Sequence, residues 1–138
     1  MRYLIILVCL VFIGCAPKVS YKDIYNAYER VDFSDGINRN EAILVAQKEI
    51  IKRGLGDRVF SFKPIDVEHQ YVWETKGEKI YLQGPPSDGF EFEVDEKWLV
   101  LFKDKENTYF FGAYPPIPMY VEIDAKTGDV LHVGLKKD

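Results

Sequence analysis

The clearest pattern along this chain is the alternation of apolar and polar residues near its end. Residues 120–124 alternate in this way, which is the period of a half-buried β-strand. Residues 125–128 predict a tight turn in which Gly128 can adopt a positive φ, and residues 130–133 supply a returning strand. Because a lone two-stranded hairpin is only marginally stable in water, other elements must cover this one.

Four earlier segments also have strand patterns. Residues 98–102, Trp-Leu-Val-Leu-Phe, form a continuous apolar run that is typical of a central strand covered on both faces. Residues 65–74 alternate largely between apolar and polar positions, and a brief strand pattern lies at residues 80–82. Residues 90–94 alternate apolar residues with glutamate, which predicts one more strand.

Two segments have helical spacing. Residues 40–53 place their apolar side chains on one face and charged side chains on the other, which predicts an amphipathic helix. Asn38 and Glu41 have the spacing of a capping box at its start, and Gly54 is a suitable residue to follow its end. A shorter apolar stripe over residues 21–31 predicts a first, short helix.

Together these elements predict an α+β fold, in which one long helix packs on a curved antiparallel sheet of about four to five strands. A signal peptide and a short helix are expected to precede this domain. The chain of 138 residues fits one domain, and 47% hydrophobic with 29% charged residues is typical of a folded one. The net charge is −4 and lysines are interspersed with glutamates, so no basic surface for nucleic acid is expected.

The N-terminus has the features of a secretion signal. Arg2 supplies one positive charge, and residues 3–13 form an apolar run of 11 residues. This run is too short to span a bilayer, which needs ~20 residues, but it has the length of a signal-peptide core. Gly14 and Cys15 follow, and the sequence resembles the lipobox of bacterial lipoproteins, with Phe12 where leucine is usual.

This resemblance implies that residues 1–14 are removed as a signal peptide and that Cys15 is lipidated on its sulfur and its new amine. Each buried CH₂ contributes ~0.8 kcal/mol, so two or more acyl chains hold a protein stably on a membrane. Ala16, rather than aspartate, follows the cysteine, which in some Gram-negative lipoproteins favours the outer membrane, facing the periplasm. The alternative is an ordinary signal peptide that is cleaved elsewhere.

Cysteine usage agrees with a lipid anchor. The only other cysteine, Cys9, lies inside the predicted signal peptide, so the mature chain would have no internal disulfide. The predicted organisation is therefore a signal peptide at residues 1–14, a lipid-anchored tether with a short helix at residues 15–37, and an α+β domain at residues 38–138.

Sequence motifs for catalysis are missing. The chain has no glycine-rich phosphate loop, no Gly-x-Ser-x-Gly elbow and no paired-histidine metal motif. His69 is expected to be half-buried and hydrogen-bonded rather than a metal ligand. Residues 32–38 look like a calcium loop, but the glycine and glutamate positions do not have EF-hand spacing. We therefore expect no enzymatic activity, no metal and no cofactor.

The order of elements resembles small domains of the PepSY and cystatin-like kind, in which an antiparallel sheet wraps one helix. The final hairpin carries the turn residues of such domains, which are Ile123, Asp124, Thr127, Gly128, Val130 and Leu131. The resemblance covers residues 38–135. A second similar group is the immunity proteins with a nuclear-transport-factor-2-like fold, which pass a Lys-Pro pair like Lys63-Pro64. Neither family supplies catalytic residues that match this chain.

Two proline-rich loops, residues 84–89 and 113–119, are the candidate contact surfaces, because pre-ordered loops bind at low entropic cost. Tyr114, Ile117 and Tyr120 would form a partner-binding patch, unless the prolines only shape a connection and protect a sheet edge. The predicted function is a lipid-anchored, non-enzymatic binding or inhibitory module of the bacterial cell envelope, held on the membrane through Cys15 and contacting a protein partner. The alternatives are an immunity lipoprotein that neutralises a toxin and a small envelope hydrolase with two facing carboxylates.

Overall fold

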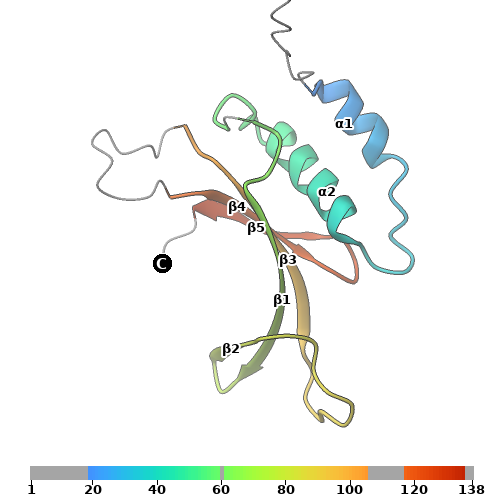
Figure 1. The fold of residues 1–138 in the computed structure, drawn as a ribbon, viewed down its shortest axis with the longest axis vertical. Coiled ribbons are helices and arrows are strands. Elements are labelled where there is room, and N and C mark those ends of the chain that lie inside the picture. The colour runs from blue at the N-terminus through green and yellow to red at the C-terminus, as the bar shows by residue number, and fades with distance from the viewer. Residues whose placement is uncertain (1–18, 60, 106–116, 136–138) are drawn as a thin grey trace, which may run out of the picture.

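A computed structural model describes residues 19–59, 61–105 and 117–135 of the chain. These residues form two helices and five strands (Figure 1). The helices are α1 (Tyr21–Tyr28) and α2 (Arg39–Lys52). The strands are β1 (Asp66–Thr75), β2 (Glu78–Leu82), β3 (Asp95–Phe102), β4 (Met119–Asp124) and β5 (Val130–Leu135).

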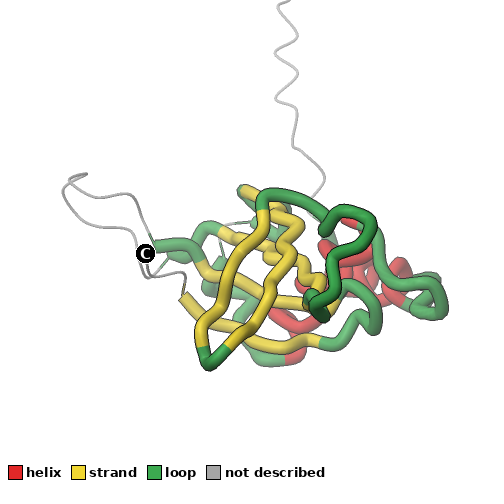
Figure 2. Tube along the Cα trace, turned by 90° about the horizontal axis from the view of Figure 1, so that it is seen from below, coloured by secondary structure: helices red, strands yellow, loops and turns green. Residues whose placement is uncertain are grey.

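The five strands form one antiparallel sheet in the order β2-β1-β3-β4-β5. The sheet is strongly twisted, because β4 and β5 run across the direction of β1 and β3 in Figure 1, and the strands curve in the view of Figure 2. The predicted α+β class and antiparallel sheet are confirmed. At 14 residues, however, α2 is a helix of ordinary length, so the prediction of one long helix is wrong in that detail.

The start of α2 follows the predicted capping box. The side-chain oxygen of Asn38 accepts hydrogen bonds from the backbone N–H groups of Asn40 and Glu41, at 2.9 and 3.1 Å. The Glu41 carboxylate in turn accepts from the backbone N–H of Asn38 at 2.8 Å. These bonds satisfy N–H groups that a helix leaves unpaired at its first turn, which fixes where α2 begins.

The core lies between α2 and the sheet. Ala42, Ala46 and Ile50 of α2 are fully buried, and α2 packs on β3, β4 and β5. Along residues 98–102 of β3, every second residue faces α2 and belongs to this core. The residues between them face the other side of the sheet and are buried as well. All five residues 98–102 are buried, so the prediction of a central strand covered on both faces is confirmed.

The segment before α2 packs on the domain. Ile24 of α1 is buried, and the ring of Tyr21 meets that of Phe62 edge-on at 5.4 Å. Ile37 belongs to the core, and its backbone N–H donates to the carbonyl of Ala125 at 2.8 Å. The loop between the helices is therefore attached to the turn of the final hairpin.

One predicted strand is replaced by a loop. Residues 90–94 lie in the connection from β2 to β3, which has to cross β1 because β1 lies between these strands in the sheet. A chain that crosses over a strand cannot pair with it, so the alternating pattern of Phe90 and Phe92 reflects packing of their rings rather than sheet formation. Within the three described ranges, neither helix is long and apolar enough to cross a membrane.

Candidate functional site

The sheet extends beyond its helical cover. Packing of α2 is on β3, β4 and β5, whereas neither helix makes substantial contact with β1 or β2. Figure 1 shows β2 at the opposite end of the longest axis from α1. We call residues 71–96 the wing: they comprise the end of β1, all of β2, the loop that follows it and the first two residues of β3.

An aromatic cluster occupies the face of the wing that would otherwise meet a helix. Trp73 lies on the same face of β1 as His69 and Tyr71, because side chains two residues apart share a face. The Trp73 ring lies 4.7 Å from the ring of Phe92, and 6.0 Å from that of Phe90, to which it is nearly perpendicular. Phe92 nevertheless remains 55% exposed, so the cluster is only partly shielded from water.

Strand β2 adds further apolar surface on both faces. Ile80 lies opposite Trp73 in the sheet and is 39% exposed, and Tyr81 on the other face is 61% exposed. Single exposed apolar side chains are ordinary, but a contiguous group of large ones marks an interaction site on a soluble domain. The wing is such a group, because Trp73, Ile80 and Phe92 share one face.

The wing also carries the negative charge of the chain. It contains seven carboxylates and two lysines, whereas the rest of the chain has 15 acidic and 16 basic residues. The electrostatic potential is therefore concentrated at this end, which favours a cationic partner. The charged residues are Glu74, Lys76, Glu78, Lys79, Asp88, Glu91, Glu93, Asp95 and Glu96.

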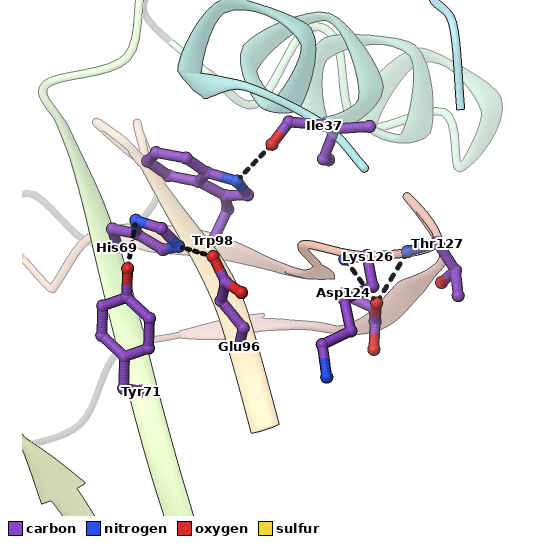
Figure 3. A network of polar contacts seen from close by, with 8 residues as sticks. All are labelled: Ile37, His69, Tyr71, Glu96, Trp98, Asp124, Lys126 and Thr127. Atoms are coloured by element: carbon purple, nitrogen blue, oxygen red, sulfur yellow. Dashed lines mark hydrogen bonds and ion pairs between the residues drawn. The ribbon is translucent and has the colours of Figure 1, made fainter. Parts of the chain in front are cut away.

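A polar network connects the wing to the core (Figure 3). The His69 ring stacks on Trp98 with a centroid distance of 4.1 Å, and its Nε2 lies 2.7 Å from a Glu96 oxygen. The Trp98 indole N–H donates to the carbonyl of Ile37 at 2.9 Å. His69 is thus hydrogen-bonded as predicted, but it is exposed rather than half-buried, because the helical cover ends here; it ties β1 to β3.

The network raises the pKa of its phenol, Tyr71. Tyr71 makes a long contact of 3.4 Å to Nδ1 of His69. Burial, followed by the negative charge of Glu96, raises the pKa of Tyr71 above its ordinary value of 10.0. A phenol with a raised pKa keeps its proton near neutral pH, so the Tyr71 hydroxyl can act as a hydrogen-bond donor in this network.

A groove lies beside this network. It is an open groove of about 690 Å³, lined by the loop of residues 32–38, Glu41, Glu96 and the turn at residues 125–126. Three of the four carboxylates that line it have partners: Ser34 for Asp32, the Asn38 backbone for Glu41, and His69 for Glu96. Across the described ranges, no group of three or more histidine, cysteine or acidic side chains lies close enough to hold a metal ion.

The described residues include two of the four site residues predicted from the sequence. Cys15 and Tyr114 lie outside the described residues, and Ile117 is half-buried just before β4. Tyr120 lies on the face of β4 away from α2, with its hydroxyl 2.8 Å from Nδ1 of His132. The pKa of Tyr120 is raised above its ordinary value, first by burial and then by the charges of Glu122 and Tyr81.

No family model, curated protein or solved structure matches this chain. The candidate site is therefore defined by the geometry of the chain alone. The sequence pattern does not predict Trp73, Ile80 or Phe92 as site residues. They alternate with polar residues in the same way as the residues of a strand whose inner face is covered.

Proposed function

We propose that the protein is a lipid-anchored, non-enzymatic binding module of the bacterial cell envelope, with a domain of the PepSY or cystatin-like kind. In this proposal Cys15 carries the acyl chains, and the wing contacts a protein partner. The observation that supports the binding role is the aromatic cluster of Trp73, Phe90 and Phe92, which lies on a part of the sheet that neither helix covers.

The position of the wing suits this role. Three residues lie between Cys15 and Val19, where the described chain begins, and the four steps from one to the other span at most ~14 Å when extended. A lipid on Cys15 would therefore keep α1 close to the membrane surface. The wing, at the other end of the longest axis, would point away from the membrane, where a partner can reach it (Figure 1).

An immunity lipoprotein is the special case in which the partner is a toxin. The seven carboxylates of the wing favour a basic toxin, because complementary charge speeds the encounter of two proteins and excludes like-charged competitors.

The anchor is tested by mass spectrometry of the mature N-terminus. We expect cleavage before residue 15, an acylated Cys15 and recovery with membranes. Cys15→Ser should abolish both the lipid and the membrane association. A wild-type protein that is unmodified and freely soluble would remove the anchor from the proposal.

The binding role is tested by cross-linking in envelope preparations. Phe92→Ser removes an exposed ring from the wing, and Tyr25→Ser removes a partly exposed ring from α1 as the matched control. We expect a cross-linked partner with the wild type and with Tyr25→Ser, and its loss with Phe92→Ser. Equal cross-linking by all three proteins would show that the wing is not the contact surface.

A further inference from the structure

The wing ends in a sheet edge. β2 is the outermost strand and pairs only with β1, so the groups on its other side form an unpaired row. Among the residues that the structure describes, no backbone group outside β1 bonds to β2. Such a row of N–H and C=O groups is a template for another strand.

The edge of β2 is more accessible than the opposite edge of the sheet. Residues 78–81 are all exposed, and the pairing of β2 with β1 runs without a bulge. At the other edge, β5 is packed against α2, and its pairing with β4 is interrupted near Ile123. Bulges and covering elements block edge pairing, so β2 is the edge that the described part of the chain leaves open.

The two faces of β2 define what an added strand would meet. Glu78, Ile80 and Leu82 lie on the face of the aromatic cluster, since they pair with Thr75, Trp73 and Tyr71. An incoming strand that presents apolar side chains two residues apart would extend the cluster at Ile80 and Leu82. A lysine or arginine two residues further along would meet Glu78 and the negative charge of the wing.

We propose that the partner adds an extended strand to the outer edge of β2, with alternating apolar side chains and a flanking lysine or arginine. This inference rests on the proposed function, because it names the chemistry of the partner that the wing binds. Main-chain hydrogen bonds would supply affinity, and the contacts at Ile80 and Glu78 would supply specificity.

A second copy of the chain is the less favourable occupant. Antiparallel self-pairing centred on Ile80 would place Lys79 of one copy opposite Tyr81 of the other. It would also bring together two wings that each carry seven carboxylates and two lysines. Repulsion between these like charges opposes the pairing, whereas a cationic strand is attracted.

The test uses the full chain in detergent and the synthetic peptide Lys-Thr-Val-Thr-Ile-Thr-Lys. One control peptide has proline at the central threonine, and the other has glutamate in place of both lysines. Amide hydrogen exchange is followed by NMR. We expect exchange of the outward-facing β2 amides to slow by about tenfold or more on binding, and both control peptides to bind about tenfold more weakly.

Two protein variants make the test specific to this edge. Ile80→Lys places a charge on β2, and Leu131→Lys places the same charge on the opposite edge strand, where Leu131 is 46% exposed. We expect Ile80→Lys to weaken peptide binding by about tenfold and Leu131→Lys to change it by less than about twofold.

Several outcomes would overturn strand addition. These are no peptide binding, binding without slowed exchange in β2, and equal effects of the two variants. Slowed exchange that appears without peptide and grows with protein concentration would assign the edge to a second copy instead. A partner that depends on Phe92 but leaves β2 exchange unchanged would refute strand addition and leave the proposed function standing.

Discussion

At the residue scale, the ion pair between Arg58 and Asp104 depends on the fold rather than on local sequence. The two residues are 46 positions apart, and Asp104 lies between two lysines in a segment rich in charged residues, a local sequence that gives no sign of burial. Its side chain is instead 0% exposed. Nε and Nη2 of Arg58 donate to the carboxylate at 2.9 to 3.2 Å, which compensates the charge.

Loss of one partner should therefore be costly. Arg58→Ala removes this counter-charge from a buried carboxylate and should lower the free energy of unfolding by about 3 kcal/mol or more. Arg53→Ala removes the exposed pair with Glu49 and should cost less than about 1 kcal/mol. Urea denaturation of both variants measures the difference, and similar costs would mean that the buried pair adds no stability.

At the scale of elements, the final hairpin shows how closely local sequence can define a turn. The side chain of Asp124 accepts hydrogen bonds from the backbone N–H groups of Lys126 and Thr127, both at 2.8 Å. Gly128 has a φ of +75°, as predicted. A Cβ atom at Gly128 would also lie 2.4 Å from the ring of Phe33, a contact that only the tertiary structure reveals.

Two glycine substitutions separate these causes. Gly77 also has a positive φ, +81°, in the turn between β1 and β2, but a Cβ there would meet nothing within 4 Å. Gly77→Ala should lower the free energy of unfolding by about 1 to 2 kcal/mol through backbone strain alone. Gly128→Ala should cost about 1 to 3 kcal/mol more, because the Phe33 ring must move. Equal losses in thermal denaturation would show that this ring yields without cost.

Element lengths explain why the wing is uncovered. The 14 residues of α2 span about 21 Å as a helix, whereas the 10 residues of β1 span about 33 Å as a strand. A helix of this length cannot cover the whole strand. The lengths predicted for the helix and for this strand therefore indicated that part of the strand would extend beyond the helix. The alternation within β1 did not identify which end would be exposed.

At the scale of the whole molecule, the described residues form a body that α2 covers and a wing that neither helix covers. The body contains the buried cluster of α2, β3 and β4, and the His69–Glu96 contact lies where the wing begins. Fewer buried apolar side chains support β2 than β4. Regions with few buried contacts open at lower free energy than the core.

Hydrogen exchange of the unliganded protein should reveal this division. We expect the bonded amides between β1 and β2 to exchange at least about tenfold faster than those between β4 and β5. The second pair is the matched control, because β5 is also an edge strand but packs against α2. Equal exchange rates would mean that the Trp73 cluster stabilises the wing as well as a helix would.

The sequence by itself determined the elements whose cause is local: the capping box at Asn38, the turn at Gly128, and the buried run at residues 98–102. These follow from hydrogen bonds within a few residues and from alternation along one strand. Only the tertiary structure decided that residues 90–94 cross β1 as a loop, that Asp104 is buried, and that Trp73 and Ile80 face an uncovered surface. Burial depends on what packs against a residue, and the packing partner is distant in the chain.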